Sequence, residues 1–242
     1  MTAVTTNTPA DTTATPVITT REVCRYFGDD EETMVKAVDR ISIDIEPGEF
    51  TAIIGPSGSG KTTLLHMIGG LDNPTSGVVE LSGTNIAQMS GAELSDFRRD
   101  HIGFIFQSYN LIPVLSAEEN IEYIMLLQGV SAAERKQRVN QMLEQVGLAG
   151  LGGRRPNKLS GGQQQRVAIA RAMASHPDII LADEPTANLD SKTGIALLDV
   201  MRELNEEHNM TFVFSTHDEK IMARASRLIH IQDGQVEKDE TK

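Results

Sequence analysis

The sequence Gly55-Pro56-Ser57-Gly58-Ser59-Gly60-Lys61-Thr62 lies between an apolar run at 50–54 and a segment of helical character that begins near Lys61. Glycines allow successive backbone N–H groups to turn toward one anion, and a helix start adds unpaired amides and the positive end of its dipole. Lys61 can reach terminal phosphates, and the Thr62 hydroxyl can hold Mg²⁺. The alternative is a flexible Gly/Ser loop, which the following Lys-Thr and the position between strand and helix disfavour. The stretch therefore predicts a site for a nucleoside triphosphate.

Apolar runs alternate with helical patterns on both sides of this stretch. Predicted strands cover 41–45, 50–54, 78–81, 102–106, 179–182 and 210–215, predicted helices cover 61–69, 90–100 and 191–207, and a hairpin is predicted at 227–238. Strand signals vanish from about 110 to 175, where Ser116–Glu119 and Ser131–Glu134 resemble the capping boxes that open helices. This order predicts an α/β fold with a mainly parallel sheet, covered on both faces, and a helical insertion.

The composition limits the partners and the compartment. The 242 residues suit one sizeable α/β domain, and a net charge of −12 disfavours a general nucleic-acid partner because phosphate backbones repel an acidic surface. A single cysteine, Cys24, excludes an internal disulfide and fits a reducing compartment. No apolar run approaches the roughly 18 residues of a bilayer span, and no secretory signal precedes Arg21. The Thr-rich residues 1–20 resemble a disordered tail.

Two carboxylates, Asp183 and Glu184, directly follow the predicted strand 179–182. Ligands of open α/β sheets bind at the carboxyl ends of the strands. Asp183 is therefore placed to steady Mg²⁺ beside Thr62, and Glu184 to accept a proton from an attacking water. The alternative is a solvated strand end before Pro185, which becomes improbable in a chain that also carries a phosphate-binding loop.

A second glycine-rich helix start is found at Leu159-Ser160-Gly161-Gly162-Gln163. Ser160 has the character of an N-cap, and a helix is predicted from Gln163 to Ala174. The exposed amides at this helix start predict a second anion site in the same chain. Taken by itself, the segment would by default be an ordinary helix cap.

These motifs together resemble the ATP-binding cassette (ABC) ATPases. The segments that carry the resemblance, in the order seen in that family, are Gly55–Thr62, Gln107, Leu159–Gln163, Asp183-Glu184, Ala187-Asn188-Leu189-Asp190 and His217. The resemblance covers about residues 18–238. It implies a P-loop NTPase (RecA-like) core, an N-terminal antiparallel β part and a helical subdomain at about 108–174, with tails at 1–17 and 239–242.

The resemblance also implies ATP and Mg²⁺ as ligands and assigns roles to residues. The residues expected to bind the nucleotide are Phe27, Gly55, Pro56, Ser57, Gly58, Ser59, Gly60, Lys61, Thr62 and Thr63. The expected catalytic residues are Glu184, His217 and Gln107, and the expected Mg²⁺ ligands are Thr62, Gln107 and Asp183. Either Tyr26 or Phe27 is expected to stack on adenine, and alignment on Gly28 favours Phe27.

A homodimer is implied as well. Ser160, Gly161, Gly162 and Gln163 are expected to contact the γ-phosphate of the nucleotide held by the other subunit, and Asp190 to belong to the loop that links the two sites. ATP would then join the subunits, and hydrolysis would loosen them.

Within the family, the chain is most similar to the ATPases of macrolide-export and lipoprotein-release systems, with cell-division and haem-export ATPases as close relatives. The segments that support this are Gly70–Gly77, Asn110–Pro113, Glu119–Ile121 and Pro185–Asp190. This resemblance implies a separate polytopic membrane permease that docks near Gln107–Glu119, and a location at the cytoplasmic face of the membrane. It favours export or mechanical signalling across the bilayer.

Two other classes of ATP-binding protein fit this sequence less well. A soluble ABC ATPase acting on DNA or ribosomes usually carries a long coiled-coil insertion, zinc modules or tandem cassettes, whereas this chain has one signature, one cysteine and an acidic composition. A scaffold that binds ATP without turnover is disfavoured by the presence of both Glu184 and His217.

Overall fold

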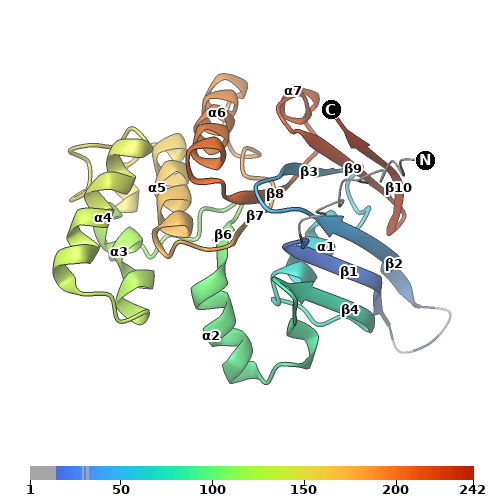
Figure 1. Ribbon diagram of the computed structural model, residues 1–242. Helices are drawn as coiled ribbons and strands as arrows, with labels where there is room; N and C mark the ends of the chain where they lie inside the picture. Colours follow the sequence, from blue (N-terminus) through green and yellow to red (C-terminus); the bar gives the residue numbers. More distant parts are fainter. Residues whose placement is uncertain (1–14, 29, 31–32) are drawn as a thin grey trace, which may run out of the picture.

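The structure is a computed structural model that describes residues 15–28, 30 and 33–242 (Figure 1). The predicted disordered tail lies outside the described residues as far as residue 14. Residues 18–20, which the Thr-rich composition assigned to that tail, are instead the start of a strand, because they pair with neighbouring strands on both sides. The strands are β1 (Ile18–Phe27), β2 (Val35–Ile45), β3 (Phe50–Ile54), β4 (Ser76–Leu81), β5 (Thr84–Asn85), β6 (Ile102–Ile105), β7 (Ile179–Ala182), β8 (Thr211–Thr216), β9 (Arg227–Gln232) and β10 (Gln235–Thr241). The helices are α1 (Lys61–Ile68), α2 (Gly91–His101), α3 (Ala117–Leu127), α4 (Ala132–Gln145), α5 (Gly161–Ala174), α6 (Ser191–His208) and α7 (Glu219–Met222), with short 3-10 helices η1 (Ile86–Gln88) and η2 (Pro156–Lys158).

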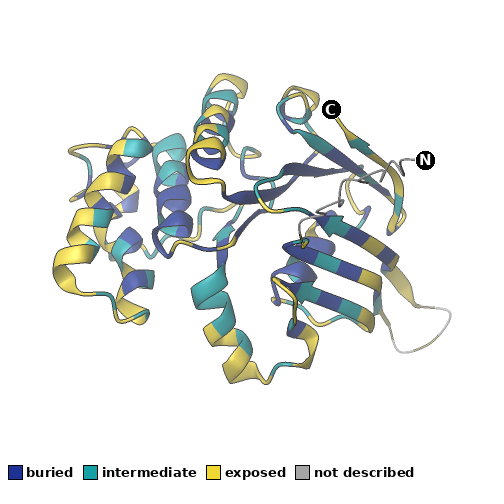
Figure 2. Cartoon of the chain, in the orientation of Figure 1, coloured by how far each residue is buried: buried dark blue, intermediate teal, exposed yellow. Residues whose placement is uncertain are grey.

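A six-stranded sheet in the order β10-β9-β3-β8-β7-β6 forms the centre of the molecule. Its strands pair in parallel from β9 to β6, and β10 is added antiparallel at one edge. The strands β3, β7 and β8 are buried along their whole length, as parallel strands covered on both faces must be (Figure 2). Two hydrophobic clusters pack against the sheet, one including α5 and α6 and the other including α1. The predicted α/β fold with a mainly parallel sheet is confirmed.

A second sheet in the order β2-β1-β4-β5 is antiparallel and supplies the expected N-terminal β part. The sequence did not predict β1 and began β2 at Ile41 instead of Val35. The physical reason is irregular pairing: the β1–β2 register shifts three times, and Glu22 and Arg40 have positive φ angles of 48° and 54°. Because each bulge shifts the side-chain alternation, the apolar pattern of these strands is broken in the sequence.

The region between β6 and β7 contains helices α3, α4 and α5 and no strand, as predicted for residues 110–175. Ser116 and Glu119 form a complete capping box, whereas Ser131 accepts a bond from the Glu134 amide without the reciprocal side-chain bond. Helix α5 begins at Gly161, two residues before the predicted start. A capping box between Ser160 and Gln163 explains this, because the glutamine side chain is already part of the first turn.

The C-terminal hairpin is longer than predicted, since β10 continues to Thr241 where the sequence placed a tail from 239. Arg227 of β9 pairs with Asp239 at 2.7 Å and with Glu49 at 3.0 Å. The ion pair aligns the end of β10 with β9, and no apolar pattern in the sequence signals it.

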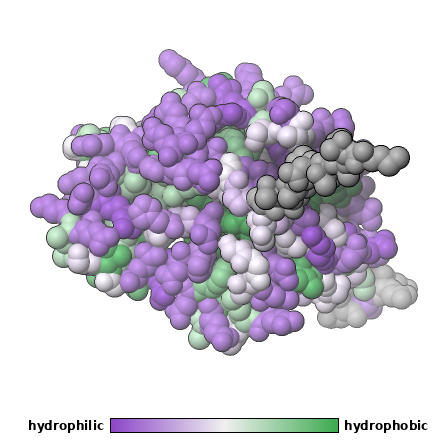
Figure 3. Space-filling model, viewed as in Figure 1, coloured by the Kyte–Doolittle hydropathy of each residue, from purple (hydrophilic) through white to green (hydrophobic). Residues whose placement is uncertain are grey.

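The visible surface is mostly hydrophilic, with small hydrophobic areas between hydrophilic residues (Figure 3). Among the described residues, no helix combines the length and apolarity that a bilayer crossing needs. The single thiol, Cys24, is buried in β1 with 4 % of its surface exposed, so it is structural in this fold.

Candidate functional site

The loop 55–60 connects β3 to α1 and requires glycine at two positions. Gly55 and Gly60 have φ angles of 154° and 104°, which other residues rarely adopt. A Cβ at Gly55 would lie 2.1 Å from the Ile231 carbonyl oxygen, and a Cβ at Gly60 equally close to that of Ala37. The neighbouring strands β9 and β2 therefore press against the loop and fix its shape.

The Lys61 ammonium is held inside this loop. Its Nζ donates to the carbonyl oxygens of Gly55 and Pro56, both at 2.9 Å, and the residue is only 7 % exposed. In the described part of the chain, no carboxylate forms an ion pair with it. The Ser59 hydroxyl is also buried without a partner there. A buried cation satisfied only by carbonyls, next to an unpaired hydroxyl, fits an anionic ligand.

Three strand and helix ends meet beside this loop. Thr62 Oγ1, in the first turn of α1, donates to Asp183 Oδ1 at 2.9 Å, and Ser215 Oγ of β8 donates to the same oxygen at 2.7 Å. The Glu184 amide in turn donates to Ser215 Oγ at 2.8 Å. Thr62 and Asp183 thus offer adjacent hydroxyl and carboxylate oxygens, the kind of ligand that suits Mg²⁺ together with water and phosphate oxygens. The structure brings together the two residues that the sequence paired, and it adds Ser215.

The Glu184 side chain lies next to His217. Glu184 Oε1 and His217 Nδ1 are 2.9 Å apart, with the histidine 67 % exposed and the glutamate 18 % exposed. Glu184 has a φ of +46°, an unusual conformation for a residue with a side chain, and the following Pro185 restricts it further. Such backbone strain is typical of residues that a functional site holds in place.

Gln107 lies at the same edge of the sheet, just beyond β6. Its carbonyl oxygen accepts a bond from Asn188 Nδ2 at 2.9 Å, and its side chain is exposed. Asn188 belongs to the segment 183–190 that also carries Glu184. The structure therefore ties the Gln107 loop to the loop after β7, on the side of the sheet where Thr62 and Asp183 meet.

The Ser160 turn is exposed, and Gly162 within it lies next to Thr193 near the start of α6. Helix α6 runs beside α5 (Figure 1). A Cβ at Gly161 would lie 2.9 Å from the Tyr109 hydroxyl, and a Cβ at Gly162 would lie 2.7 Å from Thr193 Cγ2. A larger residue at either position would therefore push a neighbouring side chain aside. Asp190 caps α6: it accepts from the Lys192 and Thr193 amides, and hydrogen bonds from Thr193 hold the pKa of its carboxyl below the ordinary value.

The two candidate adenine-stacking rings have different surroundings. The Tyr26 hydroxyl donates to Asp39 Oδ1 at 2.6 Å, and this bond raises the pKa of Tyr26. Phe27 is 42 % exposed, and the Arg25 guanidinium lies 4.5 Å from the centre of its ring. The Phe27 ring is therefore exposed and carries no hydrogen-bonded group, whereas the Tyr26 ring is held by its hydroxyl.

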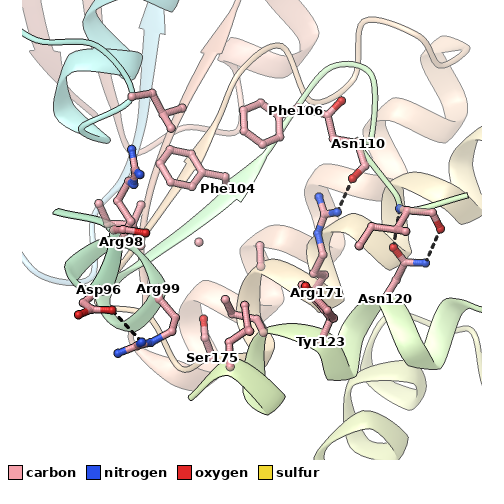
Figure 4. Close-up of a pocket in the computed structure, with 18 residues that line it drawn as sticks. Asp96, Arg98, Arg99, Phe104, Phe106, Asn110, Asn120, Tyr123, Arg171 and Ser175 are labelled. Atoms are coloured by element: carbon pink, nitrogen blue, oxygen red, sulfur yellow. Dashed lines mark hydrogen bonds and ion pairs between the residues drawn. The ribbon is translucent and has the colours of Figure 1, made fainter. Parts of the chain in front are cut away.

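A groove of about 590 Å³ opens between α2, β6, α3 and α5 (Figure 4). Its wall contains the apolar side chains of Phe104, Phe106, Tyr123 and Leu127. Arg171 lies in it with Nη1 bonded to the Asn110 carbonyl at 2.5 Å and Nη2 to that of Tyr109, and burial lowers the pKa of its guanidinium. The sequence predicted a surface at 107–119 but did not predict that α2 forms the opposite wall.

Buried Asn120 shapes the loop that borders this groove. Its amide group accepts from the Ile112 amide at 2.8 Å and donates to the carbonyls of Ile112, Leu115 and Ser116. One side chain thus ties together four backbone groups of the segment 112–116. In the sequence, only the buried position of an asparagine on a helix could have signalled this.

Residues 38–187 match the sequence family described as ABC transporter. An uncharacterised ABC transporter ATP-binding protein of Thermotoga maritima is 50 % identical over 85 % of this chain and 88 % of its own length. The macrolide export ATP-binding/permease protein MacB of Mannheimia succiniciproducens is 46 % identical over 93 % of this chain. The chain spans about a third of the length of such exporters, 35 % in this case.

A solved structure shows the same fold. The ATP-binding cassette MJ0796, in a dimeric post-hydrolysis state bound to ADP and Pi, has a TM-score of 0.85 and 42 % identity, and the match covers 93 % of this chain and 98 % of that one. The protein MJ0796 of Methanocaldococcus jannaschii is 46 % identical in sequence over 86 % of this chain.

Proposed function

Because this chain belongs to the ABC transporter family and is an ATPase, we propose that it works as a homodimer that drives a membrane permease of the export type. The observation that carries the proposal is the arrangement at one sheet edge: the phosphate loop, the Thr62–Asp183 pair and Glu184 adjoin there, while the Ser160 turn is exposed. One chain thus holds one nucleotide and presents a second anion-binding turn outward.

The phosphate loop is proposed to bind the ATP phosphates. The backbone N–H groups of residues 57, 58 and 60 and of the start of α1 would face the anion, and Lys61, already desolvated, exchanges carbonyl partners for phosphate oxygens. Thr62 and Asp183 would hold Mg²⁺, with Gln107 nearby at the same edge. When bound, Mg²⁺ neutralises negative charge on the phosphate oxygens. Phe27 would stack on adenine.

Glu184 is proposed as the general base. Its Oε1 is engaged by His217, which leaves Oε2 to accept the proton of a water that attacks the γ-phosphorus. As the new P–O bond forms, the bond from the γ-phosphorus to the bridging oxygen breaks and ADP keeps that electron pair. His217 is largely exposed, so it is able to turn and donate to a γ-phosphate oxygen.

The dimer completes each site. A two-fold arrangement would bring Ser160, Gly161, Gly162 and Gln163 of one copy to the γ-phosphate held by the other, with Asp190 between the two sites. The exposed start of α5 has amides free for this contact beyond those that the capping box uses. The dimeric cassette that shares 42 % identity with this chain supports the proposal.

The groove beside Gln107 is the proposed docking site for a helix of a separate permease at the cytoplasmic face of the membrane. Leu71, Tyr123 and Leu127 line it and are exposed apolar residues, which would pack on the apolar face of such a helix. Arg98 donates to the Gly70 carbonyl and Arg171 to those of Tyr109 and Asn110. Neither forms an ion pair within the described residues, so the groove favours a docking helix that carries a carboxylate.

Recovery of partners from solubilised membranes tests the proposal. The tagged chain should recover a polytopic membrane protein, and Leu127→Glu should recover much less because it places a charge on the apolar wall. Equal recovery by both proteins would rule out the groove as the docking site. Recovery of ribosomes or DNA would instead favour the soluble ABC ATPases, which gain no support from the relatives described above.

A further inference from the structure

The buried amide of Gln165 connects two parts of the molecule that the proposed function uses separately. Gln165 lies on α5, one turn after Gly161, and 0 % of its surface is exposed. Its Nε2 donates to the carbonyl oxygen of Pro185 at 2.6 Å. A fully buried amide must find its partners inside the protein, and Gln165 finds one in the loop that follows β7.

The position of the Pro185 carbonyl bears directly on Glu184. Pro185 follows Glu184 in the chain, and its ring fixes its own φ, so a bond that holds its carbonyl limits how the preceding residue can turn. Glu184 is in the strained left-handed region, with its amide bonded to Ser215. The strained residue is therefore held from β8 through its amide and from α5 through the Pro185 carbonyl.

The other polar atom of the same side chain is unused. Gln165 Oε1 is buried and has no hydrogen-bond partner among the described residues. A buried acceptor without a donor is uncommon in proteins because it costs free energy. A neighbouring N–H group that moved within hydrogen-bond distance would remove that cost. The contact between α5 and the loop thus has an unused acceptor available when the two shift relative to each other.

From this geometry we infer that Gln165 is a positioning residue, which couples the helix that begins at Ser160 to the placement of Glu184. The inference rests on the proposed roles of Glu184 as base and Ser160 as a contact to the second nucleotide. Movement of α5 when a partner's nucleotide meets Ser160 is passed by the Gln165–Pro185 bond to the base of the chain's own site.

Gln165→Met tests this in the full chain, because methionine has a similar volume and cannot donate to Pro185. The kcat for ATP should fall by about tenfold or more, with the KM within about twofold, since misplacing a reacting group lowers the rate more than binding. Asn205→Leu is the control: Asn205 is a buried amide that donates to the carbonyls of Gly48 and Met210, away from the site. This control should lower the melting temperature and leave kcat within about twofold.

A double-mutant cycle with Glu184→Gln separates positioning from general loosening. In single-turnover assays Gln165→Met should slow the wild type about tenfold but the E184Q protein less than about twofold, because the base is then already absent. Equal slowing in both backgrounds, or a kcat within about twofold of wild type for Q165M, would overturn the inference. Undiminished turnover of E184Q alone would instead remove Glu184 from the proposed function.

Gln165→Glu provides a second test if Q165M does not fold. A carboxyl group can donate to Pro185 only while protonated, so the activity of this variant relative to wild type should rise as the pH is lowered from about 8.5 to about 6, the range over which a buried carboxyl titrates. A ratio that does not change with pH would contradict the inference.

Discussion

The two glycine-rich helix starts, before α1 and before α5, differ in what their glycines and side chains do. Before α1, Gly55 and Gly60 have positive φ angles and Lys61 is buried without an anionic partner in the described chain. Before α5, neither Gly161 nor Gly162 has a positive φ, and a capping box pairs the amides of Ser160 and Gln163. The first start thus has the backbone shape and the buried cation of an anion site, whereas the second is a capped helix start with an exposed surface. In the function proposed above, the first start binds the nucleotide of its own chain and the second contacts the nucleotide of a second copy.

The largest effect is expected from Glu184→Gln, which leaves both helix starts intact. Turnover should fall by about 10²–10⁴-fold because the general base is lost. ATP affinity, measured by calorimetry, should stay the same, and ATP should trap a dimer visible in size-exclusion chromatography. If hydrolysis continued at the wild-type rate, Glu184 would not be the base.

Lys61→Ala removes the buried cation of the helix start before α1 and leaves the start before α5 unchanged. Loss of a charge-assisted contact should weaken ATP binding by about 2–3 kcal/mol, or roughly 30- to 150-fold. Calorimetry with the monomeric chain measures this directly, and Lys192→Ala, an exposed lysine at the start of α6, is the matched control. Unchanged affinity in K61A would contradict the phosphate-loop assignment.

Ser160→Arg changes the exposed N-cap residue before α5 and leaves the helix start before α1 unchanged. A bulky cation at this turn should prevent a second copy from approaching, so ATP-dependent dimerisation of the E184Q protein should weaken by at least about tenfold. ATP affinity of the monomer should remain within about twofold, since the first helix start is untouched. Sedimentation of the two variants with ATP gives the comparison, and dimers that persist in S160R would show that the turn is not an intersubunit contact.

The smallest effect on function is expected from Gly162→Ala, a change in the second helix start. The same change in the first start, Gly60→Ala, provides the comparison. The added methyl group would push Thr193 aside at 2.7 Å, with a loss of about 1–3 kcal/mol of stability and little change in the ATP affinity of the monomer. Gly60→Ala, in contrast, meets a backbone carbonyl at 2.1 Å and should abolish ATP binding. Thermal unfolding and calorimetry on both proteins separate packing from ligand binding.

The parts of this molecule that could be predicted are those whose signal is contiguous in the chain. The buried strands β3, β7 and β8 are short apolar runs, and the phosphate loop with Asp183-Glu184 keeps its chemistry in neighbouring residues. Those regions were predicted within about two residues, which is the usual uncertainty of element ends. Bulged β1 was not predicted, and β10 was predicted only as far as Lys238, because pairing across the sheet overrides their local pattern.

The unpredicted site residues act through partners far away in sequence. Ser215 bonds Asp183, Gln165 bonds Pro185, and Asn188 bonds the Gln107 carbonyl. A serine at a strand end or a glutamine in a helix has no local feature that reveals such a partner, so only the folded structure identifies it. The assignment of adenine stacking to Phe27 stays a prediction, supported by its exposed ring.

The burial of Cys24, the single cysteine of the chain, has a practical consequence. A thiol that is 4 % exposed reacts slowly with maleimides, so a cysteine introduced at an exposed position could be labelled selectively without first removing the native one. Fluorophores attached in this way near the start of α5 would report, by energy transfer between two labelled copies, how far apart the copies are at each stage of the ATP cycle.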